Sequence, residues 1–104
     1  MEEAGRAFGN HRASAACLSE SFARLDHKSG LIEDALTGVF LKSCLATADR
    51  DPSLCAGVPA ASEILASVQW RMAECSRNGR PDDQRCARLL EAIQDHCHQA
   101  VGAH

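Results

Sequence analysis

Cysteine and histidine are the residues of this 104-residue chain whose types and spacing could do chemistry. Two histidines flank a cysteine in DHCHQ, residues 95 to 99, and both residue types are ligands for zinc or copper. On a helix, however, His96 and His98 point about 200° apart, so they cannot share one ion with Cys97. Neither a C-x2-C pair nor an H-x3-H pair occurs. The pattern therefore favours structural disulfides over a metal site or free redox thiols.

The six cysteines allow fifteen pairings, and helix geometry removes some of them. Cys86 and Cys97 bracket an amphipathic stretch, CARLLEAIQDHC. They share one face of that helix but lie about 16 Å apart along its axis. A disulfide needs Cα atoms within about 7 Å, so these two cysteines must reach other elements.

The turns predicted from the sequence suggest which cysteines are bonded to each other. Cys75 and Cys86 flank one predicted turn, which places them at the neck of a helical hairpin. Cys44 and Cys55 have the same arrangement about an earlier turn. The last two cysteines lie near the start of the first helix and the end of the last, which are neighbours in an antiparallel bundle. The predicted disulfides are Cys17–Cys97, Cys44–Cys55 and Cys75–Cys86.

Composition and periodicity predict an all-α fold. Three Phe, one Trp and no Tyr are few for strands, which select aromatic and β-branched residues, whereas the abundant Ala and Leu favour helices. Apolar periodicity and Pro or Gly punctuation predict helices at about 12–27, 31–48, 59–77 and 81–101, with one further helical turn in PSLCAG. Short links between them predict a disulfide-stapled antiparallel four-helix bundle, as a single helical domain spanning 1–104.

Apolar stripes predict which helix faces form the core. In the second predicted helix the main stripe is Ile32, Leu36, Val39 and Phe40. The third carries Ala61, Ile64, Leu65, Val68, Met72 and Cys75 on one face, and the fourth carries Cys86, Leu89, Leu90, Ile93, Cys97 and Ala100.

Apolar residues outside these stripes, and the pinned polar turns, predict a protein-binding surface. Trp70 lies on the polar side of the third helix, where it either anchors an interface or is covered by the N-terminal segment or by a rotation of the helix. Leu31, Gly38, Leu41 and Leu45 form a second apolar line on the second helix, which is therefore either central in the packing or an interface. Turns held by disulfides lose less entropy on binding. The predicted partner-binding residues are Trp70, Arg77, Asn78, Arg80, Asp82, Asp83, Asp49, Asp51, Leu41 and Leu45.

Several function classes are disfavoured. The net charge of −3 has no basic block, which argues against nucleic acid, and no apolar run approaches the roughly 18 residues of a membrane span. Catalytic motifs do not occur, so we expect no enzyme activity, no metal site and no cofactor. The N-terminus MEEAGRAFGNHR has no apolar signal region. We therefore expect that, if the protein is exported, this sequence starts after the cleavage site and Met1 is an added start.

The Cys-bearing helices CLSESF, LKSCLA and MAECSR, together with the chain's size and helical pattern, resemble periplasmic immunity proteins of type VI secretion peptidoglycan-amidase effectors. The resemblance implies an extracytoplasmic location and a rigid loop or helix face that plugs the amidase's Cys–His cleft. It also implies a possible homodimer. Two alternatives stay open: a periplasmic metal or small-ligand carrier that uses the cysteines with His96 and His98, and a structural subunit of an envelope complex.

Overall fold

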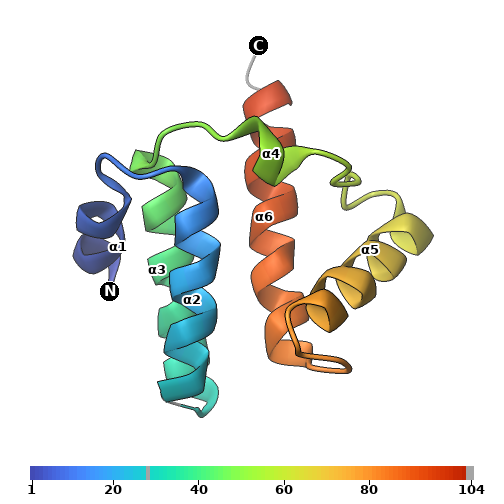
Figure 1. Cartoon of the computed structure of the whole chain (residues 1–104), viewed down its shortest axis with the longest axis horizontal. Helices are drawn as coiled ribbons and strands as arrows, with labels where there is room; N and C mark the ends of the chain where they lie inside the picture. The colour runs from blue at the N-terminus through green and yellow to red at the C-terminus, as the bar shows by residue number, and fades with distance from the viewer. Residues whose placement is uncertain (28, 103–104) are drawn as a thin grey trace. The chain divides into compact units, whose positions relative to one another are not determined.

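A computed structural model describes residues 1–27 and 29–102, and the side chains among them through Gln99. It contains α-helices and no strand over these residues (Figure 1), which confirms the all-α prediction. Among the described residues no helix has the length and apolar character needed to cross a membrane. The helices are α1 (Glu2–Gly9), α2 (Ser14–His27), α3 (Leu31–Thr47), α4 (Pro52–Cys55), α5 (Ile64–Arg77) and α6 (Gln84–Gly102).

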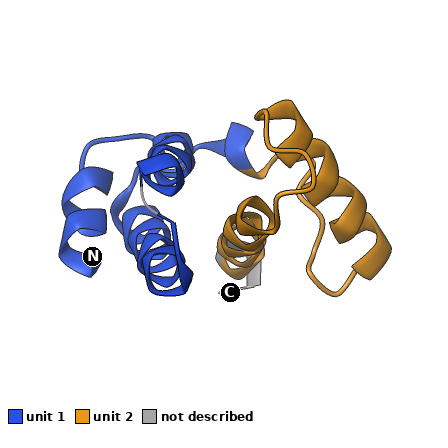
Figure 2. Ribbon diagram, turned by 90° about the horizontal axis from the view of Figure 1, so that it is seen from below, with its two compact units in different colours: residues 1–54 blue, residues 55–104 orange. Residues whose placement is uncertain are grey.

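The chain divides into two compact units, Met1–Leu54 and Cys55–His104 (Figure 2). The sequence predicted a single domain over 1–104. Each of the three disulfides closes within one of the two units. The arrangement of the four long helices as one antiparallel bundle stays a prediction.

Four of the six helices correspond to the predicted ones, and the single turn in PSLCAG is α4. The third and fourth predicted helices begin later than expected, at Ile64 and Gln84 rather than near Pro59 and Pro81. The first helix, α1, was not predicted. Its sequence EEAGRAFG holds two glycines, and glycine weakens a helix by about 1 kcal/mol relative to Ala. Tertiary packing outweighs this cost, as the contacts below show.

In the first unit, α2 and α3 form an antiparallel hairpin (Figure 1). Phe22 and Leu25 of α2 are buried, together with Phe40, Leu41 and Leu45 of α3. The predicted core face of α3 is therefore wrong in large part: of its main stripe only Phe40 is buried. Leu41 and Leu45, predicted to bind a partner, belong instead to the buried set.

The contacts of α1 explain why the face of α3 with Leu41 and Leu45 is buried instead of the predicted stripe. This helix packs along α3, and its Gly5 and Gly9 are buried there. An added Cβ at Gly5 would meet the Phe40 carbonyl oxygen, and one at Gly9 would meet the Cys44 carbonyl oxygen. Because the two glycines bring the backbones this close, α1 covers the part of α3 from Phe40 to Thr47. Sequence periodicity showed two apolar lines on α3 but could not show which of them this extra helix covers.

Aromatic and polar contacts fix the same junction. The Phe8 ring of α1 lies 5.7 Å from the Phe40 ring of α3, centroid to centroid. Arginine guanidinium groups lie 3.9 Å from each ring centroid, Arg12 over Phe8 and Arg24 over Phe40. Thr47 also donates a hydrogen bond of 2.9 Å to the Arg6 carbonyl. The last turn of α3 is thereby tied to α1.

The disulfides are Cys17–Cys44, Cys55–Cys97 and Cys75–Cys86. The predicted Cys75–Cys86 pair is confirmed, with Cα atoms 6.0 Å apart. The predicted pairs Cys17–Cys97 and Cys44–Cys55 are wrong. These three bonds contain all six cysteines of the sequence.

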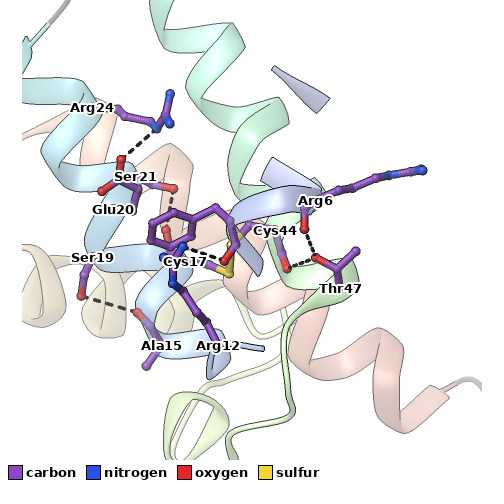
Figure 3. The surroundings of a disulfide bond; sticks show 11 residues. Arg6, Arg12, Ala15, Cys17, Ser19, Glu20, Ser21, Arg24, Cys44 and Thr47 are labelled. Carbon is purple, nitrogen blue, oxygen red and sulfur yellow. Dashed lines mark hydrogen bonds and ion pairs between the residues drawn. A yellow bond between two sulfur atoms is a disulfide. The ribbon is translucent and has the colours of Figure 1, made fainter. Parts of the chain in front are cut away.

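The Cys17–Cys44 pair follows from the α2–α3 hairpin (Figure 3). Cys17 lies three residues after the start of α2 and Cys44 three residues before the end of α3. In an antiparallel pair these positions stand at the same level, and their Cα atoms are 5.7 Å apart. The prediction assigned Cys17 to the last helix because it treated the first and last helices as neighbours.

The Cys44–Cys55 prediction is wrong because each of these cysteines bonds to a cysteine of its own unit. After α3 the chain forms an isolated parallel bridge between Ala13 and Asp49, ahead of α2. The Asp49 amide donates to the Arg12 carbonyl at 2.7 Å, and the Ser14 amide donates to the Asp49 carbonyl at 3.0 Å. Cys55 of α4 instead meets Cys97 of α6, with Cα atoms 5.4 Å apart.

A non-reduced tryptic map tests the pairing directly. Trypsin cleaves after Lys and Arg, and this puts every cysteine on its own peptide: 13–24, 43–50, 51–71, 72–77, 86–88 and 89–104. We expect three linked species by mass spectrometry, 13–24 with 43–50, 51–71 with 89–104, and 72–77 with 86–88. A link between 13–24 and 89–104 would contradict the structure.

The glycine contacts of α1 give a second prediction. Gly5→Ala or Gly9→Ala should destabilise the protein by about 1–3 kcal/mol, because the added methyl overpacks a close backbone contact. The matched control is Gly38→Ala in α3, where an added Cβ meets nothing within 4 Å and Ala is the better helix former. Urea unfolding followed by circular dichroism measures both. Equal stability of all three variants would show that α1 does not dock through its glycines.

Candidate functional site

The second unit is built on α6, whose predicted stripe is confirmed as core as far as Cys97. Cys86, Leu89, Leu90, Ile93 and Cys97 are all buried, and the last predicted member, Ala100, lies outside the residues whose side chains are described. Cys97 holds α4 through the bond to Cys55, and Cys86 holds the end of α5 through the bond to Cys75. The two helices that precede α6 in the chain, α4 and α5, are therefore both linked to it covalently.

A buried amide on α6 sets how α5 packs against it. Gln94 is 1% exposed, and a buried amide must have hydrogen-bond partners. Its Nε2 donates to the Ser67 hydroxyl at 2.9 Å and to the Pro59 carbonyl at 3.1 Å. Its Oε1 accepts a hydrogen bond of 2.9 Å from Arg71. Ser67 in turn donates to the Ala60 carbonyl. The polar line of α5, rather than its apolar stripe, thus faces α6.

The apolar stripe of α5 is consequently left exposed. Ile64 and Leu65 are 76% and 71% exposed, and Met72 is 61% exposed. Val68 is also exposed, because it lies one residue, or about 100° around the helix, from the buried Ser67. The prediction that this stripe forms core is therefore wrong, except at Cys75. In α5 only Ser67 and Cys75 are buried, and the second is fixed by its disulfide.

The turn between α5 and α6 is rigid for local reasons. Gly79 has φ 73°, a left-handed conformation that glycine adopts without strain. The Arg80 amide donates to the Cys75 carbonyl at 2.7 Å, and the Gly79 amide donates to the Ser76 carbonyl at 3.0 Å. These two bonds form a Schellman motif, which terminates α5 and satisfies its last carbonyls. Asn78 adds a side-chain bond of 2.8 Å to the Glu74 carbonyl.

The two aspartates of the turn have different roles. Asp83 caps α6: its Oδ1 accepts hydrogen bonds from the Arg85 and Cys86 amides at 2.9 and 3.4 Å. It also pairs with Arg80 at 3.8 Å. Asp82 is exposed and has φ 57°, a conformation that non-glycine residues adopt infrequently. No hydrogen bond or ion pair engages its carboxylate among the described residues.

A groove of about 370 Å³ lies where the exposed stripe meets this turn. Four of its lining residues are apolar, two are acidic, and one arginine and one glutamine complete the lining. They are Val68, Met72, Cys75 and Ala87, with Arg71, Gln84, Asp82 and Asp83. The predicted residues Asp82 and Asp83 therefore adjoin Val68 and Met72, which the sequence had assigned to the core.

The other predicted residues lie as follows. Trp70 is half-buried on α5. Arg77, at the end of the same helix, is exposed and pairs with Glu74. Asp49 and Asp51 belong to the first unit, where Asp49 forms the bridge to Ala13 and Asp51 caps α4 through the Ser53 amide at 3.1 Å. The structure assigns these last two aspartates local structural roles.

The missed site residues are Ile64, Leu65, Val68 and Met72. Their stripe was visible in the sequence, but its direction depends on Gln94, whose burial has no sequence signal.

The described residues contain no group of three or more His, Cys, Asp or Glu placed to hold a metal ion. All six cysteines are in disulfides, so none is available as a thiolate ligand. His98 bonds the Val58 carbonyl through Nε2 at 2.9 Å. The cysteine ligands that a metal carrier would need are therefore occupied.

Comparison with known proteins found no matching family model, no matching curated protein and no matching solved structure.

The capping role of Asp83 gives a third prediction. Asp83→Ala should cost about 1 kcal/mol of stability because the first amides of α6 lose their acceptor, whereas Asp83→Asn keeps an acceptor oxygen and should cost little. Chemical denaturation midpoints measure both variants with the disulfides intact. A loss in Asp83→Asn as large as in Asp83→Ala would assign the effect to charge rather than to capping.

Proposed function

We propose that this chain is an exported binding protein that engages a protein partner through the α5 stripe and the α5–α6 turn. The observation that carries the proposal is the outward apolar stripe of Ile64, Leu65, Val68 and Met72. Contiguous exposed apolar side chains of this kind mark protein interaction sites. Covering a large apolar side chain contributes up to about 1.5–3 kcal/mol, in proportion to the area removed from water.

Rigidity of α5 supports the same function. The helix is linked to α6 by Cys75–Cys86 at one end and by the Gln94 hydrogen bonds nearer its start. It cannot rotate its stripe onto α6 without breaking these bonds and leaving Gln94 unpaired. A surface that is already ordered loses little conformational entropy when a partner binds.

The three disulfides fit an extracytoplasmic protein, because such bonds persist in oxidising compartments. We place this protein in the periplasm. The partner we propose is a peptidoglycan amidase of the type VI effector kind, which the sequence resemblance implies. In this proposal the α5–α6 turn enters the amidase cleft while the α5 stripe packs beside it, and Trp70, Arg77 and Asn78 border the contact. The chain itself carries out no catalysis.

An inhibition assay tests this function. The wild-type protein should block the hydrolysis of purified peptidoglycan by a Cys–His amidase effector at near-stoichiometric ratio. Val68→Asp and Met72→Glu should weaken inhibition at least about tenfold, because each places a charge in the apolar contact. Both positions are exposed, so circular dichroism should show an unchanged fold.

The matched control is Ile32→Asp, the same kind of change at an exposed residue of the first unit. It should inhibit as wild type does. Inhibition by Met72→Glu at the wild-type level would contradict the α5 contact. No inhibition by the wild type of any amidase in a panel would contradict the amidase as partner.

A structural subunit of an envelope complex is the second candidate, and one observation favours it. The first unit also exposes apolar side chains on α3: Leu31, Ile32, Leu36 and Val39. A subunit that packs between neighbours needs two such faces, whereas an inhibitor needs one. Loss of binding in Ile32→Asp as well as in Met72→Glu would favour this candidate. The metal-carrier alternative has no comparable support, since the cysteines are paired.

A further inference from the structure

We infer that the α5–α6 groove seats an amphipathic helix of a partner protein, and that this helix carries a Lys or Arg at one end of its apolar face. The inference rests on the proposed function and specifies the chemistry of the partner at that site.

The shape of the exposed stripe indicates a helix as occupant. Ile64, Val68 and Met72 follow one another at intervals of four residues, and Leu65 lies beside them. They form an apolar row about 12 Å long that is inclined by about 26° to the α5 axis, as rows of residues spaced four apart are. A partner helix lays such a line against its own row of residues spaced three or four apart. The groove of Val68, Met72, Cys75 and Ala87 continues this line toward the turn.

The charges at the groove indicate a cation. Three charged side chains line it: Arg71, Asp82 and Asp83. Arg71 is already engaged by Gln94 at 2.9 Å and lies 4.0 Å from Glu91. The Asp83 carboxylate caps α6 and pairs with Arg80.

Asp82 is the remaining charge of this groove. It is exposed and has no hydrogen-bond or ion-pair partner among the described residues. The groove therefore presents one uncompensated carboxylate beside its apolar lining residues. A Lys or Arg fits both parts, because its methylene stem covers apolar surface while its charged end meets the carboxylate. A partner with Glu or Asp at that position would place like charges together.

Two synthetic helical peptides with the same leucine face test this inference. One carries Lys and the other Glu at the end of that face, and fluorescence anisotropy measures their binding to the intact disulfide-bonded protein. We expect the Lys peptide to bind more tightly. Asp82→Asn should weaken the Lys peptide about 3–10-fold, with a smaller effect at high salt. Met72→Glu should abolish measurable binding of the Glu peptide.

The matched control is Asp95→Asn, which removes an exposed carboxylate of α6 that does not line the groove. It should bind the Lys peptide as wild type does. The prediction that the partner helix carries a cation is overturned if Asp82→Asn also binds the Lys peptide as wild type does. It is overturned as well if the Glu peptide binds as tightly as the Lys peptide. The α5 contact of the proposed function still stands in that case, provided that Met72→Glu weakens both peptides.

Other outcomes separate the two proposals further. Equal binding of the Glu peptide to wild type and Met72→Glu would overturn the groove as its site. Failure of both peptides to bind would overturn the helical occupant, while the amidase assay decides the proposed function independently. Sedimentation of the protein alone is the last check. A dimer that Met72→Glu dissociates would show that a second copy occupies the groove, and would overturn the partner helix.

Discussion

The rest of the second unit depends on the buried amide of Gln94. A buried amide without partners is costly, and the atoms that satisfy it come from Ser67, Arg71 and the Pro59 carbonyl. These bonds fix the rotation of α5 on α6, and the Cys75–Cys86 disulfide fixes its far end. The outward direction of the apolar stripe follows from these hydrogen bonds and the disulfide together.

Helix α5 buries few apolar side chains, and disulfides supply much of the stability that such burial would otherwise provide. Only Ser67 and Cys75 of α5 are buried, which is little for a helix of 14 residues. In the loop-entropy description each of the three disulfides stabilises the fold by about 3–4 kcal/mol, against a total of about 5–15 kcal/mol for a typical domain. A chain stapled in this way can keep large apolar side chains in water, where a partner can reach them.

The first unit is stabilised in a different way from the second. It has one disulfide, Cys17–Cys44, and the close approach of α1 to α3 adds to the buried apolar core of α2 and α3. Glycines at positions 5 and 9 allow this approach, and the Phe8–Phe40 ring contact completes it. The cost of glycine in a helix is offset by burial that no other residue type would permit at these positions.

Sequence patterns were enough to predict the all-α class, most helix positions, the core stripe of α6 and the Cys75–Cys86 pair. Periodicity and local turns encode all of these over short stretches of chain. The packing of helices that are distant in the chain fixed the Cys17–Cys44 and Cys55–Cys97 pairs and the docking of α1. It also decided which faces of α3 and α5 point outward. These features depend on which helices become neighbours, and on single buried groups such as Gly5 and Gln94. A polar or small residue does not reveal from the sequence whether its surroundings will bury it, so the exposed face of α5 was predicted as core.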